Sequence, residues 1–267
     1  MKVLKLKIYQ PHAHYRIPFT YQRRHSYPIP PYSTVIGLLC NILGIRNIEG
    51  KEEPCVSQNC FCDYHKLKNI KISICGSFES KSTEYIWFRN LSKESHNNRF
   101  GYCRNRYVSG YIEHPGGQMP VLIDILNDVN LWIYFYHEDQ DFLEKIKDSF
   151  ENPQNRIYTL HLGRAEDWIV IQEISFVNLE EINYGGDFKK FFWIPRNSFL
   201  PDGSNFDFEK FGGLLYKIPT FYKLLNGKRD FIYIDAKLND GEIVISKSDT
   251  KIFYDKNENI PLFFANL

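Results

Sequence analysis

Apolar and polar positions alternate at several places along the chain, with the period of two that indicates β-strands. Residues 2–8 interleave lysines with aliphatic side chains, which predicts a half-buried first strand. Isoleucines at every second position of 70–74 predict another strand, and we expect 85–88 to continue it as a hairpin. The aromatic and aliphatic runs 131–136 and 169–171 predict two further strands.

Two segments instead repeat their apolar residues at helical spacing. Residues 35–42 form one such segment, with Ser33 or Thr34 as the expected N-cap and Gly44 as the expected stop. A second amphipathic helix is expected over 139–150, with the aspartate at its start as N-cap. Between the first helix and the second strand we expect irregular structure.

Residues 91–120 have no clean period and are rich in Asn, Gly, Arg and Tyr, so we expect a projecting arm. The predicted order is then strand, helix, strand, inserted arm, strand, helix and strand. This is the βαββαβ order of a ferredoxin-like (RRM-like) sheet.

Beyond residue 180 only short strands separated by turn residues are predicted, at 191–194, 214–218, 231–234 and 243–245. We therefore predict an α+β protein of two domains. Residues 1–178 form the ferredoxin-like domain, with the arm as a thumb at about 91–120, and residues 179–267 form a smaller β-rich domain.

The formal net charge of +1 conceals two halves of opposite charge. Residues 1–118 contain 17 Lys and Arg against 8 Asp and Glu, whereas the rest of the chain contains 16 and 24. A basic half indicates contact with a polyanion. The alternative is that the two halves neutralise each other in the fold.

The first ten residues lack the uninterrupted apolar run of a signal peptide, and no segment approaches the roughly 18 apolar residues that span a bilayer. We therefore expect a cytoplasmic protein without a membrane partner. In that compartment its six cysteines are expected as reduced thiols or metal ligands.

The segment 23–34 combines cations, rings, a proline step and a helix start. Arginines neutralise phosphates, aromatic rings stack on unpaired bases, and a helix N-terminus favours an anion. A plain loop that enters a core helix is the alternative. The RNA-binding candidates in this segment are Arg23, Arg24, His25, Tyr32, Ser33 and Thr34.

Two further segments carry candidates for RNA binding. The arm interleaves cations with rings, as suits single-stranded RNA, although a solvated basic loop has the same composition. The glycine turn in 160–167 can bring Arg164 and backbone N–H groups close to a ligand. The candidates in the arm are Arg99, Arg104, Arg106 and Tyr107.

Four potential metal ligands lie within eleven positions, namely Cys55, Cys60, Cys62 and His65. Their spacing, C-x4-C-x-C-x2-H, is not the paired C-x2-C pattern of common zinc sites. We therefore expect unligated thiols, no metal and no cofactor, with zinc as the open alternative.

Histidines 12, 14 and 25 lie close together in the basic segment. A metal-independent ribonuclease needs a general base, a general acid and a cation near the scissile phosphate. No base and acid pair is distinguished among these histidines, and we assign no catalytic residue.

The motif 31–39 (PYSTVIGLL) and the turn 162–167 (LGRAED) resemble the CRISPR-associated Cas protein family five of the RAMP superfamily. The similarity is greatest to its branch in type I-B Cascade complexes. The match extends through about residue 180 and is looser beyond. By position it relates Ser33 and Thr34 to the family's helix start, Arg164 to its glycine turn, and the arginines of the arm to its thumb.

The resemblance implies a non-catalytic subunit that binds and caps the 5′ handle of the crRNA in antiviral defence. It implies the backbone and large subunits of Cascade as partners, and contact with target DNA only through the assembled complex. One branch of the family cuts precursor crRNA, so a metal-independent endoribonuclease remains the alternative function.

Overall fold

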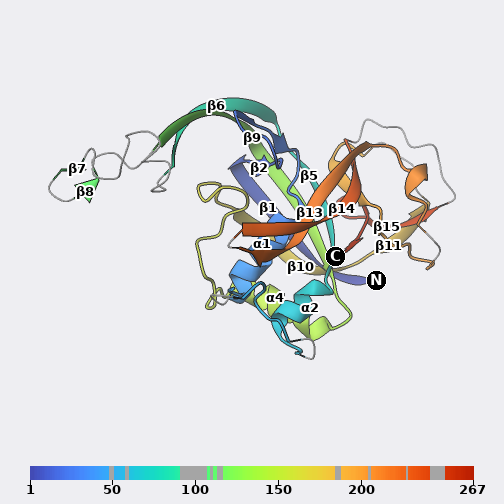
Figure 1. The fold of residues 1–267 in the computed structure, drawn as a ribbon. Helices are drawn as coiled ribbons and strands as arrows, with labels where there is room; N and C mark the ends of the chain where they lie inside the picture. Colours follow the sequence, from blue (N-terminus) through green and yellow to red (C-terminus); the bar gives the residue numbers. More distant parts are fainter. Residues whose placement is uncertain are drawn as a thin grey trace.

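The computed structural model describes ten stretches of the 267-residue chain, which are residues 1–47, 51–57, 60–90, 107–108, 111–112, 117–183, 188–203, 206–226, 228–240 and 250–267. Their architecture is mainly antiparallel sheet with few helices, as expected for an α+β protein (Figure 1). In these stretches no helix is long and apolar enough to span a membrane.

The described residues form one large sheet whose central path has seven strands. In spatial order these are β10 (Val170–Asn178), β1 (Lys2–Ala13), β9 (Gly117–Tyr136), β5 (Lys71–Ser77), β12 (Phe191–Pro195), β14 (Lys228–Asn239) and β13 (Leu214–Leu225). Three strands pair beside this path, namely β3 (Arg23–Arg24) and β6 (Ser80–Asn90) with β9, and β17 (Ala265–Asn266) with β5. The strands after residue 180 therefore extend the sheet begun by the first half.

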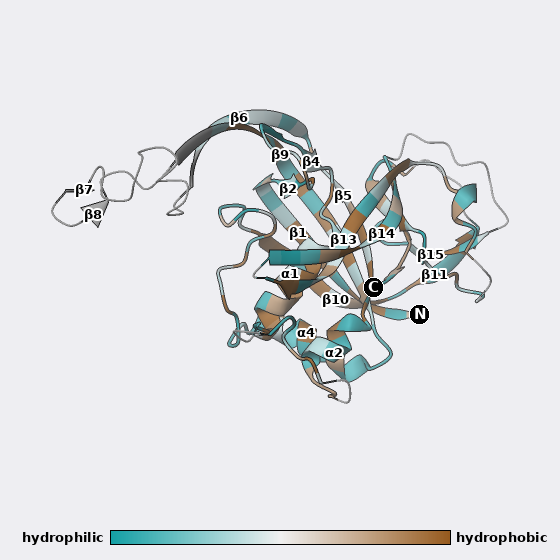
Figure 2. Ribbon diagram, viewed as in Figure 1, coloured by the Kyte–Doolittle hydropathy of each residue, from teal (hydrophilic) through white to brown (hydrophobic). Residues whose placement is uncertain are grey.

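Three helices are described, α1 (Tyr32–Leu43), α2 (Asp63–Lys68) and α4 (Gln140–Glu151), besides a short 3₁₀ turn at Phe208–Lys210. The buried faces of α1 and α4 share one core with the aliphatic residues of β1, β5 and β9. Figure 2 shows hydrophobic colouring where α1 meets the sheet and hydrophilic colouring along α2. The helices thus cover one face of the sheet.

A second core lies on the other face, beneath the C-terminal segments. It is rich in phenylalanine, and Phe192 stacks on Phe263 with centroids 5.7 Å apart. A small sheet packs here, made of β11 (Glu180–Asn183), β15 (Lys251–Asp255) and β16 (Ile260–Leu262). Two-stranded pairs complete the description, β2 (Tyr15–Arg16) with β4 (Ser26–Tyr27) and β7 (Tyr107–Val108) with β8 (Tyr111–Ile112).

Burial of β1 on both faces corrects the expectation of a half-buried first strand. Lys5 is only 4% exposed, and its Nζ lies 3.0 Å from Glu173 and 3.1 Å from Glu258. A buried cation requires such partners. The alternation of lysines with aliphatic residues therefore predicts the strand correctly. It does not reveal the C-terminal layer that covers the second face of this strand.

The expected N-cap of the first helix is also wrong. Helix α1 begins at Tyr32, its N-cap is Pro31 with φ −71° and ψ 159°, and no side chain caps it. The fixed extended geometry of proline sets the entry point, so Ser33 and Thr34 lie inside the first turn. The expected stop is confirmed, because Gly44 takes the left-handed conformation with φ 74°.

The second helix is confirmed, since the carboxylate of Asp139 accepts a hydrogen bond from the Phe142 N–H at 3.2 Å. Strand 85–88 is placed differently from the expectation, because it belongs to β6 and pairs with the first half of β9 rather than with β5. This ribbon of β6 and β9 extends away from the body of the fold (Figure 1). Most of the thumb, and the strand expected at 243–245, lie outside the described residues.

Candidate nucleic-acid interface

A cleft of about 660 Å³ lies between the start of α1, the loop before β3, the turn after residue 160 and the β13–β14 hairpin. Four arginines line it against a single carboxylate, that of Glu166. The arginines are Arg16, Arg24, Arg164 and Arg229. Such an excess of fixed cations favours an anionic ligand.

The start of α1 forms one wall of this cleft. Ser33 and Thr34 line it with Pro31, and the first turn contains no acidic residue. The Thr34 N–H donates to the Pro31 carbonyl at 3.0 Å. Because the first N–H groups of a helix lack carbonyl partners four residues earlier, this end favours phosphate oxygens and hydroxyl groups.

The glycine turn forms the opposite wall and is fixed to the end of β1. Gly163 has φ 108°, and a Cβ there would lie 2.8 Å from the His14 carbonyl oxygen. Gln10 donates to the carbonyls of Leu162 and Asp167, both at 3.0 Å. Only glycine fits this close approach of two backbone segments.

Arg164 is held in this turn by Asp167. Its Nη2 lies 2.7 Å from Asp167 Oδ1, and its backbone N–H donates to Oδ2 at 2.9 Å. Burial lowers the pKa of Arg164, but the hydrogen bonds and the negative charge of Asp167 outweigh it, so the pKa is raised overall. Glu84 and Glu166 also lie within 3.5 Å. The guanidinium is therefore a positioned cation whose charge is largely balanced.

Arg24 is half-buried in the cleft. Burial lowers the pKa of Arg24, and the nearby charge of Arg16 lowers it further. Arginine stays protonated under such shifts, so the two side chains form a local positive field. Both arginines line the same cleft as the first turn of α1.

Arg23 and His25 belong to a different cluster, because alternate residues of an extended segment point to opposite sides. Arg23 Nη2 lies 3.3 Å from Asp124 Oδ1, and His25 Nδ1 lies 2.9 Å from Asp124 Oδ2. Burial raises the pKa of Asp124, but His25, Lys81 and Arg23 outweigh it and lower the pKa overall. Both side chains remain about half exposed beside the ribbon.

The expectation that Tyr32 stacks on a base is wrong, because its side chain is fully buried in the first core. Its burial raises the pKa of its hydroxyl well above the ordinary value. Of the arm candidates, Arg99, Arg104 and Arg106 lie outside the described residues, and Tyr107 lies in β7. The cleft thus brings together Arg24, Ser33, Thr34 and Arg164.

Sequence reasoning missed several residues of the cleft. Arg229, Phe231 and Tyr233 lie at alternate positions of β14 and share one side, a period-two signal that the sequence does contain. The Arg229 guanidinium lies 4.8 Å from the Tyr222 ring centroid. Phe19 is 77% exposed at the cleft, with φ 64°. The exposed rings of Phe19 and Tyr233, with the half-buried ring of Phe231, supply faces on which bases stack.

Of the three histidines only His14 lines the cleft. Its Nδ1 lies 2.8 Å from the Asp124 carbonyl oxygen, and its buried Nε2 has no hydrogen-bond partner among the described residues. Burial lowers the pKa of His14. His12 Nδ1 lies 3.0 Å from Asn127 Oδ1, away from this lining. One group of potential metal ligands is described, and it lies outside the cleft.

The fold and the cleft together define an α+β protein with a cationic, ring-bearing surface. Residues 3–111 match the model of the family described as CRISPR-associated protein (Cas_Cas5). This match supports the resemblance to the CRISPR-associated Cas protein family five over residues 3–111. No curated protein matches the sequence.

One solved structure with a TM-score above 0.5 shares the fold, and further structures are similar at lower scores. A chain described as "CRISPR RNA-guided surveillance complex" is 10% identical, with a TM-score of 0.52, and the match covers 89% of each chain. One described as "Crystal structure of Cas protein" is 11% identical, with a TM-score of 0.47, over 92% of this chain and 96% of that one. A third, "Crystal structure of a CRISPR protein from Archaeoglobus fulgidus", is 10% identical with a TM-score of 0.42 over all of both chains.

Proposed function

We propose that this protein is a non-catalytic subunit of a type I-B-like CRISPR Cascade effector complex that binds and caps the 5′ handle of the crRNA in the cytoplasm. The convergence of four arginines, the start of α1 and the glycine turn on one cleft is the observation that carries this proposal. The family match over residues 3–111 supports it.

A single-stranded handle fits this cleft chemically. Phosphates pair with arginines, and unpaired bases stack on Phe19 and on the cleft-lining rings of β14. A duplex RNA does not offer its base faces in this way. The rings therefore favour a single strand over a helix.

We further propose a ferredoxin-like unit over residues 1–178 and a smaller β-rich unit over 179–267, whose strands β12, β13 and β14 continue the same sheet. The order β10-β1-β9-β5, with α1 and α4 as connections, is consistent with a βαββαβ unit. In this proposal the ribbon of β6 and β9 carries a thumb that contacts the guide and the backbone subunit. The large subunit is the second protein partner, and target DNA is contacted through the assembled complex.

Binding of fluorescently labelled single-stranded handle RNA over a salt series tests the function. Each neutralised phosphate should contribute about −0.7 to the slope of log affinity against log salt. We expect a slope steeper than about −2, because several arginines reach the cleft. A scaffold that binds only proteins would show almost no affinity and no slope.

The metal-independent endoribonuclease is retained as a second candidate because of His14. Burial lowers the pKa of His14, and its Nε2 has no hydrogen-bond partner in the part of the chain that the structure describes, so this imidazole beside the arginines of the cleft suits the role of a general base. Incubation of the protein with repeat RNA in EDTA separates the candidates. Intact RNA supports binding alone, whereas site-specific cleavage that His14→Ala abolishes would establish the nuclease.

A further inference from the structure

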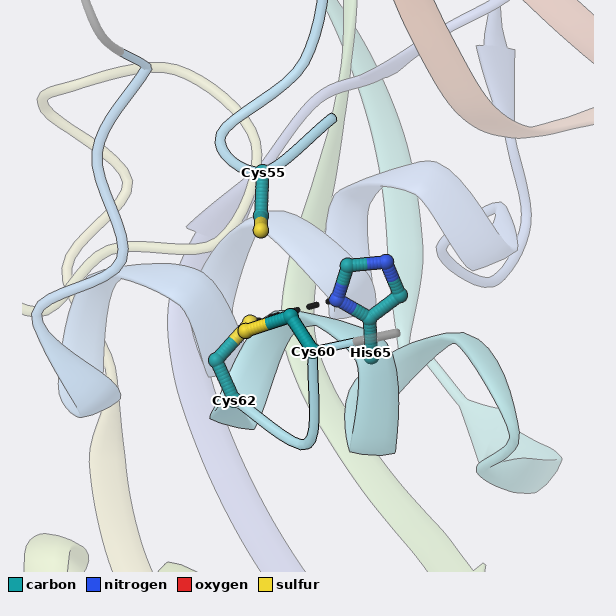
Figure 3. Close-up of side chains that lie close together, drawn as sticks. All are labelled: Cys55, Cys60, Cys62 and His65. Carbon is teal, nitrogen blue, oxygen red and sulfur yellow. Dashed lines mark hydrogen bonds between the residues drawn. The ribbon is translucent and has the colours of Figure 1, made fainter. Parts of the chain in front are cut away.

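Three cysteines and a histidine meet at one point beside α2, outside the cleft, although their sequence spacing is irregular. Cys55 comes from the irregular segment after α1, Cys60 and Cys62 precede α2, and His65 lies in the first turn of α2. Figure 3 shows the Cys55 sulfur directed at the sulfurs of the other two cysteines, with the His65 ring facing the same space.

The distances among these groups suit a single small cation. The four potential ligand atoms lie within 4.8 Å of one another, and Cys62 Sγ lies 3.2 Å from His65 Nδ1. In a tetrahedral zinc site with Zn–S bonds of about 2.3 Å, neighbouring sulfurs lie about 3.8 Å apart. The separations therefore exceed those of a zinc tetrahedron by about 1 Å at most, which small side-chain movements can close.

We propose that Cys55, Cys60, Cys62 and His65 form a structural zinc site. Three thiolates and an imidazole select a soft or borderline metal over magnesium or calcium. Four protein ligands leave no open position for water or substrate, which is the mark of a structural site. On binding, each thiol loses its proton to solvent, each sulfur and the imidazole nitrogen donates a lone pair to Zn²⁺, and nothing is oxidised or reduced.

The proposed zinc site lies where it can stabilise the segment between α1 and α2. The described residues between α1 and α2 include no helix or strand, yet Cys55 and Cys62 pack against the first core. The Leu224 N–H of β13 donates to the Glu52 carbonyl at 2.9 Å. Glu53 lies 2.5 Å from Lys68 and 3.7 Å from Lys223. A metal here would hold together the segment, α2 and the β13–β14 hairpin.

Metal analysis of the full-length protein, purified under reducing conditions without chelator, tests the site. We expect about one zinc per chain, released by a mercurial reagent that reacts with thiols. Cys60→Ser and His65→Ala should each retain less than about a fifth of an equivalent. Cys40→Ser is the matched control, because Cys40 is outside the group. This control should keep its zinc.

A second measurement covers the case in which the ligand variants fail to fold. Wild-type protein stripped of metal and reconstituted with Co²⁺ should show the visible d–d absorption of tetrahedral thiolate-bound cobalt, with a thermal midpoint above that of the stripped protein. Folded protein with less than about half an equivalent of zinc and no such spectrum would overturn the proposal. A disulfide joining two of these cysteines under reducing conditions would do the same.

Discussion

Replacing Arg24 and Arg229 together with alanine removes two cleft cations that come from opposite halves of the chain. Arg24 is half-buried and Arg229 is exposed on β14, so neither supports the main cores. If each contacts one phosphate, each loss costs about 1.5 kcal/mol, or roughly tenfold in affinity. The double variant should therefore bind handle RNA about a hundredfold more weakly at low salt.

The salt dependence gives a sharper signature than the affinity. Two lost phosphate contacts flatten the slope by about 1.4. Between about 50 and about 200 mM salt, the ratio of wild-type to variant affinity should then shrink about sevenfold. Fluorescence anisotropy with labelled handle RNA measures both quantities in one series.

Two matched controls accompany this variant. Arg24→Lys with Arg229→Lys keeps the charge and should keep the slope, although it loses bidentate geometry. Lys147→Ala with Lys256→Ala removes two cations outside the cleft, each in a surface ion pair. If this second control flattens the slope as much as the cleft variant does, binding is not localised to the cleft and the reasoning fails.

Three other substitutions test separate parts of the structure. Gly163→Ala should lower the free energy of unfolding by about 1–3 kcal/mol, because φ is 108° and the new Cβ meets the His14 carbonyl. An unchanged midpoint of urea unfolding would contradict this. Asp124→Asn should lower the free energy of unfolding at neutral pH, because a carboxyl whose pKa is lowered in the fold stabilises the fold when it is ionised. The difference between wild type and variant should disappear as the pH falls below about 4, and a difference that is constant with pH would refute this. Phe19→Ala should weaken handle binding by about 1–3 kcal/mol with an unchanged salt slope, and a flattened slope would argue against stacking.

Local patterns predicted the two longer helices, but not α2, which lies where irregular structure is expected. The helices α1 and α4, the stop at Gly44 and the cap at Asp139 follow from short-range rules that the neighbouring residues obey. The cleft residues Arg24, Ser33, Thr34 and Arg164 were also chosen from local chemistry, and the fold brings them together.

Pairing between distant segments could not be predicted in the same way. Strand β6 pairs with the first half of β9, where a local hairpin with β5 was expected. Lys5 is buried because Glu173 and Glu258 come from far along the chain to meet it. Arg229 reaches the cleft only through the β13–β14 hairpin. Such contacts depend on topology, which a single sequence does not reveal.

Photocrosslinking tests the central claim most directly. Handle RNA containing a photoreactive uridine at each position in turn is irradiated with the protein, and the crosslinked peptides are identified by mass spectrometry. The account predicts crosslinks at the rings that line the cleft, Phe19, Phe231 or Tyr233, and predicts that excess unlabelled handle RNA suppresses them. Specific crosslinks confined to surfaces outside the cleft would contradict it.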